Sequence, residues 1–129
     1  MPVAASIFRI FVPVSDIDDS LAFYRRLFDD DGREIHRGRH YFDCGPVIFA
    51  VIENNGTPIS DHIYFSVDDI ESFFERAREL DCLETDSVHG SPSGEIGVRP
   101  WGERSFYARD PSGNGLCFVD SKTLFTGVR

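Results

Sequence analysis

The chain has 129 residues, a length that suits a single domain over residues 1–129 with its own core. Its 13 Lys and Arg residues against 22 Asp and Glu residues give a net charge of −9, which repels phosphate backbones and anionic membrane surfaces. We therefore expect neither nucleic acid nor a membrane as a partner.

The first feature along the chain is an internal repeat. The segment from Ile10 to Leu27 returns in form from Ile63 to Leu80, at an offset of 53 residues. Each copy predicts a β-strand, an acidic cap and an amphipathic helix. Asp16 is expected to cap the first helix, and Asp68 with Glu71 forms a capping-box pattern before the second. Both helices should pack one face on a sheet.

Short β-like runs separated by turn residues follow each helix. We expect strands at Arg33–Arg37, Arg39–Cys44 and Val47–Glu53 in the first half, and at Leu83–Val88, Ser105–Arg109 and Gly115–Asp120 in the second. Residues 89–102 are rich in Gly, Pro and Ser and indicate a long loop, and DPSGN at 110–114 predicts a tight turn. The order is βαβββ twice, over about residues 6–53 and 61–120. This is an α+β fold whose helices cover one face of each mixed sheet and leave the other concave.

The alternation of side chains along strands predicts which residues face the hollow. Wholly apolar rows belong beneath the helices. The mixed polar and aromatic rows should face the concave side, where a ligand would bind. These rows comprise Arg9, Phe11 and Pro13; His62, Tyr64 and Ser66; Ser105, Tyr107 and Arg109; and Cys117 with Val119.

The remaining polar residues suggest structural or solvent-exposed positions. His36, His40 and His89 lie among charged or loop residues and should be exposed. The acidic run at 29–31 should end the first helix. Three cysteines without a CxxC pair argue against a disulfide framework. No apolar run approaches the roughly 20 residues that span a bilayer, and the start lacks a secretory signal pattern. We expect a soluble, unprocessed, cytoplasmic protein.

The repeated βαβββ pattern resembles the vicinal-oxygen-chelate superfamily, which includes glyoxalases, extradiol dioxygenases and bleomycin-resistance proteins. The segment EIGVRPWGERSFYARDPSGNGLCFVD, from Glu95 to Asp120, is most similar to the carboxy-terminal stretch of bleomycin-resistance proteins. Its matching features include the Pro-Trp-Gly loop at 100–102 and the DPSGN turn. The resemblance implies the paired βαβββ fold, and fold alone does not fix function.

Metalloenzymes of that superfamily carry His or Glu ligands on strands, and the resemblance places those positions on Arg9, His62 and Cys117. Arg9 has no lone pair to offer a metal, and Cys117 could bind a soft metal only as a thiolate. Glu53 is a nearby acid that could assist. His62 is thus the one weak candidate ligand, and we expect no cofactor, with one divalent transition metal as the alternative.

The leading interpretation is a bleomycin-resistance-like protein that binds a small aromatic or cationic molecule without a catalytic metal. The alternative is a metal-dependent lyase, isomerase or dioxygenase built around His62, so enzymatic activity stays open and no catalytic residue is assigned. Arg9 would oppose a cation, which keeps an anionic or neutral aromatic ligand in contention. Trp101 is either core packing or a flat wall of the site. We expect a homodimer, because open sheet edges favour symmetric association. The expected ligand-binding residues are Arg9, Phe11, His62, Tyr64, Trp101, Tyr107 and Cys117.

Overall fold

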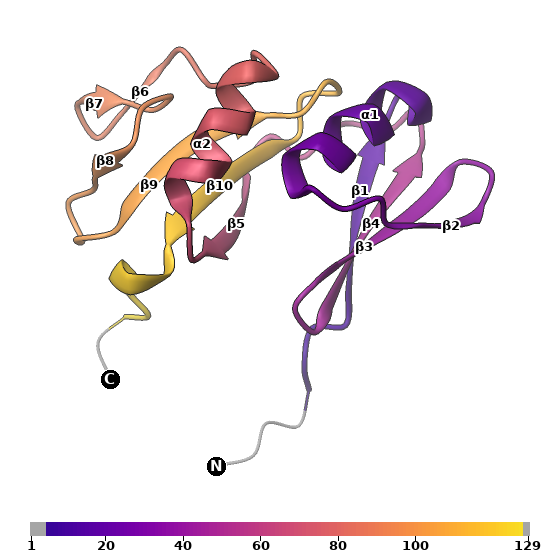
Figure 1. Ribbon diagram of the computed structural model, residues 1–129, viewed down its shortest axis with the longest axis horizontal. Coiled ribbons are helices and arrows are strands. Elements are labelled where there is room, and N and C mark those ends of the chain that lie inside the picture. The colour runs from indigo at the N-terminus through magenta and orange to yellow at the C-terminus, as the bar shows by residue number, and fades with distance from the viewer. Residues whose placement is uncertain (1–4, 128–129) are drawn as a thin grey trace.

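The computed structural model describes residues 5–127 and contains two four-stranded mixed sheets, one in each half of the chain (Figure 1). The first half forms β1 (Arg9–Val14), α1 (Ile17–Phe28), β2 (Arg33–His36), β3 (Arg39–Cys44) and β4 (Val47–Glu53). The second half forms β5 (His62–Val67), α2 (Ile70–Glu79), β6 (Ser87–Val88), β7 (Ser91–Pro92), β8 (Gly97–Val98), β9 (Arg104–Arg109) and β10 (Gly115–Asp120), then a 3-10 turn, η1 (Ser121–Thr123).

The two sheets repeat one topology. Their strand orders are β1-β4-β3-β2 and β5-β10-β9-β8, with the first strand of each sheet parallel to the last strand of its module. The other pairs within the two sheets are antiparallel. The predicted α+β fold with two βαβββ units is therefore confirmed. None of the helices within residues 5–127 is long and apolar enough to cross a membrane.

The apolar rows form one core beneath the helices, as their alternation predicts. Core members of the first half include Val12, Val14 and Phe49, and those of the second half include Phe106, Leu116 and Phe118. Rings also meet across the halves: Phe65 lies 5.6 Å from both Phe28 and Phe49, centroid to centroid. Helices α1 and α2 contact each other, and Arg76 on α2 donates a hydrogen bond to the Leu27 carbonyl at 2.9 Å. The two halves share their helix-side core.

The DPSGN turn fastens the second half to the first. Asp110 and Asn114 are both buried, and Asn114 donates from its side chain to Asp110 at 2.8 Å and to the Pro13 carbonyl at 2.7 Å. The Asn114 side-chain oxygen accepts from the Ile59 amide at 2.7 Å. The Tyr24 hydroxyl on α1 donates to Asp110 at 2.7 Å. The predicted turn is present, and its polar residues stabilise the fold.

The edge of the second sheet differs from the prediction. A continuous strand over Leu83–Val88 was wrong: Leu83 forms only an isolated bridge to Ala108, and Ser87–Val88 instead belongs to the β6-β7 hairpin. The chain returns to β9 afterwards, where the Ser93 carbonyl accepts from the Tyr107 amide and β8 pairs with Arg104–Ser105. The edge strand is therefore interrupted by a hairpin that leaves the sheet.

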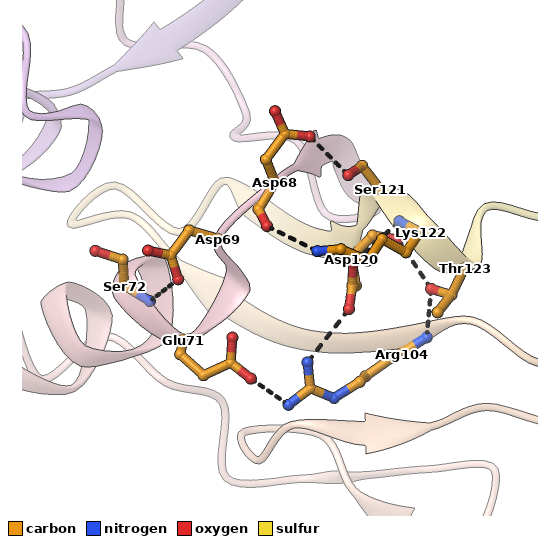
Figure 2. A network of polar contacts seen from close by, with 9 residues as sticks. All are labelled: Asp68, Asp69, Glu71, Ser72, Arg104, Asp120, Ser121, Lys122 and Thr123. Atoms are coloured by element: carbon orange, nitrogen blue, oxygen red, sulfur yellow. Dashed lines mark hydrogen bonds and ion pairs between the residues drawn. The ribbon is translucent and has the colours of Figure 1, made fainter.

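The cap of α2 also differs from the prediction. Asp16 caps α1 as expected, accepting from the Asp19 amide at 3.0 Å. The cap of α2 is Asp69, which accepts from Ser72, and not Asp68 (Figure 2). Asp68 instead accepts from the Ser121 hydroxyl at 2.6 Å and so contacts η1. The sequence offers two adjacent caps, because Asp68 precedes Glu71 and Asp69 precedes Ser72 by three residues. The contact of Asp68 with η1 leaves Asp69 as the cap.

His40 was expected on the surface and is buried, with only 2% of its area exposed. It lies on the helix-facing row of β3 beside Phe42, and its Nε2 is 2.8 Å from the Asp31 carbonyl oxygen. The other two predictions hold, because His36 and His89 are exposed. Asp29 ends α1 in a left-handed conformation, as the acidic run indicated.

Candidate functional site

The concave side of the second sheet brings four of the expected site residues together. Strand register places Tyr64 of β5 opposite Cys117 of β10, and Cys117 opposite Tyr107 of β9. The His62 ring lies 4.8 Å from the Tyr107 ring in an edge-on arrangement. Tyr107 and Cys117 are buried, whereas 60% of Tyr64 is exposed. The exposed part that this surface offers to a ligand is the phenol ring of Tyr64.

The two buried titratable groups of this row, the Cys117 thiol and the Tyr107 phenol, are both protonated at neutral pH. Burial raises the pKa of Cys117 to about 12, against opposing hydrogen bonds with Ser105 and Tyr107. Burial likewise raises the pKa of Tyr107, and the neighbouring Cys117 and Tyr64 raise it further. A neutral thiol is a poor nucleophile and a poor metal ligand. Cys117 therefore acts as a packing residue of the concave wall.

His62 is held by a carboxylate that the sequence did not reveal. Its Nε2 lies 3.1 Å from Glu84 Oε2, and the Arg109 Nε donates to Glu84 Oε1 at 2.7 Å. Arg109 also donates to the carbonyls of Ser60 and Gly113, which fixes its position. Glu84 follows the isolated bridge at Leu83, so only the tertiary pairing with β9 carries it to His62. The carboxylate is neutralised by Arg109 within this cluster.

A second residue missed from the sequence is Arg99, which lies in the glycine-rich loop yet is only 3% exposed. Its guanidinium stacks over Tyr107 at 5.1 Å and donates to Ser105 Oγ at 3.0 Å and to the Ser105 carbonyl at 2.7 Å. It also donates to the Glu95 carbonyl. Arg99 forms no ion pair within residues 5–127, and its Nη1 has no hydrogen-bond partner there.

The first sheet carries the other two expected concave residues. Arg9 and Phe11 lie on β1, with Phe11 48% exposed. The Arg9 guanidinium carbon lies 5.1 Å from the Phe8 ring centroid and 5.8 Å from the Tyr41 ring centroid. No contact among the described residues joins Arg9 to His62. Within one chain the expected site is thus divided between two sheet faces.

Trp101 lies apart from both groups. Its indole N–H donates to Glu103 at 2.7 Å, and its ring packs edge-on against His89 at 4.8 Å. The side chain is 36% exposed at the end of the second sheet. Glu103 also accepts from the Phe125 amide, so the same carboxylate joins this loop to the segment after η1.

The three positions to which the resemblance assigned metal ligands do not form a ligand set. Arg9 cannot coordinate a cation, His62 contacts Glu84, and Cys117 is a protonated thiol. Glu53 lies on the helix-facing row of β4, where its Oε2 accepts from the Ile17 amide at 3.0 Å. Across residues 5–127, no group of three or more His, Cys, Asp or Glu side chains is placed to hold a metal ion. The residues present do not fit the divalent metal of the alternative interpretation.

Two cavities lie beside the concave rows. One, of about 540 Å³, is lined by the segment from Leu80 to Asp86, which includes Glu84, and by Arg109. The other, of about 550 Å³, lies between the halves among apolar residues such as Ile10, Phe28 and Phe65. Neither is lined by Arg9, Tyr107 or Cys117. Tyr64 lines the second cavity, whereas Ser105, Tyr107, Cys117 and Val119 of the same concave face are buried.

Comparisons with solved structures agree on the fold. A structure described as oxidase ChaP-H1 matches with a TM-score of 0.76 and 24% identity, over 97% of this chain and 100% of that chain. Lactoylglutathione lyase from Agrobacterium tumefaciens matches with a TM-score of 0.66 and 23% identity, over 92% and 95% of the chains. A bleomycin-binding protein complexed with bleomycin matches with a TM-score of 0.67 and 18% identity, over 90% and 98%. At these identities the likeness shows a shared fold.

Sequence comparison supplies the family. No curated protein matches the chain. The family model for the glyoxalase/bleomycin resistance protein/dioxygenase superfamily matches residues 6–118, which include the first βαβββ unit, the DPSGN turn and the second unit as far as Phe118 in β10. The chain therefore belongs to the glyoxalase/bleomycin resistance protein/dioxygenase superfamily.

Proposed function

We propose that this protein binds a small aromatic molecule against its concave sheet faces, without a catalytic metal. The observation that carries the proposal is the composition of those faces: Phe11 and Tyr64 present exposed rings two residues along their strands from Arg9 and His62, which do not form a metal-ligand set. Exposed aromatic side chains offer large apolar contact area with little loss of conformational freedom. The structural neighbours include a protein complexed with bleomycin, so a binding role occurs on this fold.

The metal-free part of the proposal rests on the three mismatched positions. Arg9 brings a permanent positive charge, and His62 is engaged by Glu84, which Arg109 also binds. Elemental analysis of protein purified without chelator should find no stoichiometric transition metal. One tightly bound metal per chain, lost in His62→Ala, would contradict this and support the lyase, isomerase or dioxygenase alternative.

Binding itself is testable with a panel of planar aromatic compounds followed by saturation-transfer NMR. Phe11→Ser and Tyr64→Ser should each weaken binding, because each removes an exposed ring from a concave row. Val98→Ser is the matched control, since Val98 is 68% exposed but pairs with Arg104 on the helix-facing row. Saturable binding that all three variants retain would reject the concave faces as the site.

The proposed assembly is a homodimer in which a second copy closes the open faces. Strands β1 and β5 each lie at the end of their sheet and pair on one side only among the described residues. Exposed apolar side chains flank β1: Ile7 is 68% exposed and Phe8 is 61% exposed. Unpaired edges and apolar patches of this kind favour association. Sedimentation at micromolar concentration should give twice the 14.6 kDa chain mass, and a monomer alone would contradict the proposal.

A further inference from the structure

Three arginines converge on one phenol ring of the first sheet. The guanidinium carbons of Arg9, Arg33 and Arg39 lie 5.8, 5.8 and 5.7 Å from the centroid of Tyr41. Arg39 also donates to the Tyr41 hydroxyl at 2.6 Å, which fixes its fork beside the ring. The three come from β1, β2 and β3, so only the folded sheet assembles them.

Strand register places this cluster on the concave side. Tyr41 is opposite Ala50 on one side and Arg33 on the other, and Ala50 is opposite Phe11, so these four side chains share a row. Arg9 and Arg39 occupy the flanking rows of the same face. The exposed Phe11 ring therefore lies in the row between the two arginines.

The cluster carries an excess of positive charge. Arg33 is neutralised by Asp43 at 3.0 Å, but Arg9 and Arg39 form no ion pair within residues 5–127. Glu53, the acidic residue of the neighbouring strand β4, faces the helix side, where its carboxylate accepts from the Ile17 amide at the start of α1. Three arginines therefore share one carboxylate, Asp43, and the ring of Tyr41 offsets the repulsion between their charges only in part. The charge of this cluster is therefore positive, although the net charge of the chain is −9.

The second sheet also contains an arginine without an acidic partner among residues 5–127. Arg99 is buried over Tyr107 without an acidic partner, and one of its nitrogens lacks any hydrogen-bond partner among residues 5–127. The one carboxylate beside His62, Glu84, is already paired with Arg109. Asp61 and Glu103 lie near the exposed Tyr64 on this sheet, so the excess of exposed positive charge belongs to the first sheet, which favours negative over positive ligands. A guanidinium binds a carboxylate through two parallel N–H donors, which matches its planar shape and charge.

From this placement we infer that the ligand is an aromatic anion, whose carboxylate or similar planar oxyanion binds between Arg9 and Arg39 while its ring packs on Phe11. This inference rests on the proposed aromatic-binding function and specifies the ligand's charge. The cationic ligand considered from the overall charge is disfavoured, because the net negative charge does not extend to this face.

The test uses three probes with one ring system and different charges: 2-naphthoate, 2-naphthamide and 2-naphthylmethylammonium, titrated calorimetrically. We expect the wild type to bind naphthoate at least about tenfold more tightly than the amide, as one charge-assisted pair permits. The ammonium compound should bind most weakly. Added salt should weaken naphthoate binding more than amide binding.

Variants separate this cluster from the overall charge. Arg9→Met and Arg9→Met/Arg39→Met should reduce the preference for naphthoate over naphthamide by about tenfold, because they weaken naphthoate binding more than amide binding. Arg78→Met removes the same charge from an exposed pair with Glu75 on α2 and should preserve the preference. Because Arg9 is exposed, the single variant tests the idea even if loss of the Arg39 hydrogen bond perturbs the sheet.

The outcomes distinguish the two proposals. Equal binding of acid and amide, or tightest binding of the ammonium compound, overturns the anion inference and leaves aromatic binding intact. Loss of the preference in Arg78→Met as well as Arg9→Met would assign it to overall charge and also overturn the inference. Binding of none of the three probes would reject the proposed function and this inference with it.

Discussion

The Asn114 side chain gives the most direct test of how the two halves are joined. Asn114→Ala keeps the backbone of the DPSGN turn but removes side-chain bonds to the Pro13 carbonyl, the Ile59 amide and Asp110. All three lie at distances of 2.7 to 2.8 Å, and Asn114 has no exposed surface. Water cannot replace the lost partners without opening the seam between β1 and the linker.

The expected cost follows from those three bonds. A typical buried hydrogen bond contributes about 1 kcal/mol net, and a partner left unsatisfied costs about 1–3 kcal/mol. Asn114→Ala should therefore lower the free energy of unfolding by about 3–5 kcal/mol. Since domains of this size are stable by about 5–15 kcal/mol, the variant should still fold at low temperature.

Equilibrium urea unfolding, followed by far-ultraviolet circular dichroism, measures this loss. Asn54→Ala is the matched control, because the Asn54 side chain accepts a single exposed hydrogen bond from the Gly56 amide. That change should cost less than about 1 kcal/mol. A loss below about 1 kcal/mol for Asn114→Ala would show that the turn does not hold the halves together.

Four further substitutions test other parts of the structure by the same unfolding measurement. Asp69→Ala should lower the free energy of unfolding by about 1 kcal/mol and Asp68→Ala by less than about 0.5 kcal/mol, because only Asp69 caps α2. A larger loss for Asp68→Ala would instead support the cap that the sequence predicted. Gly94→Ala should lower the free energy of unfolding by about 2 kcal/mol or more, since the added Cβ would lie 2.0 Å from the Glu84 carbonyl oxygen. An unchanged stability would mean that the backbones at Gly94 and Glu84 are not packed this closely. The pKa of Cys117, raised by burial to about 12, exceeds the ~8.5 of an unfolded thiol. The unfolded chain thus loses that proton first as pH rises, so stability is full below about pH 8.5 and falls above it. Between about pH 9 and 11 the wild type should lose about 1.4 kcal/mol per pH unit more than Cys117→Ala, and parallel pH profiles would contradict the assignment.

The sequence predicted the fold well where a periodic pattern and tertiary packing act together. Alternation along β1, β5 and β10 correctly separated core rows from concave rows, because a strand with one covered face must alternate. The same rule applied to β3 would have placed His40 beside Phe42 in the core. Its charged neighbours indicated exposure instead, although Arg39 and Tyr41 share the opposite face.

The site was less predictable, since its contacts join segments far apart in the chain. His62, Tyr64, Tyr107 and Cys117 were grouped correctly by strand register. Glu84 and Arg99 were missed because both lie in irregular segments, where no period indicates the direction of a side chain. The burial of Arg99 depends on acceptors supplied by the Ser105 hydroxyl and carbonyl, which become available only when β8 pairs with β9.

The β6-β7 hairpin leaves the second sheet after Glu84 and the chain returns at Ser93, which bonds to the same residue of β9, Tyr107. The chain is therefore hydrogen-bonded to β9 both before and after the hairpin. The hairpin can change length or sequence without breaking these bonds to the sheet. Val88 in this hairpin packs on the cluster of Tyr107, Cys117 and Val119. An exchange of these few residues would reshape the wall over the concave row while the framework stays intact, so relatives with different ligands are expected to differ here first.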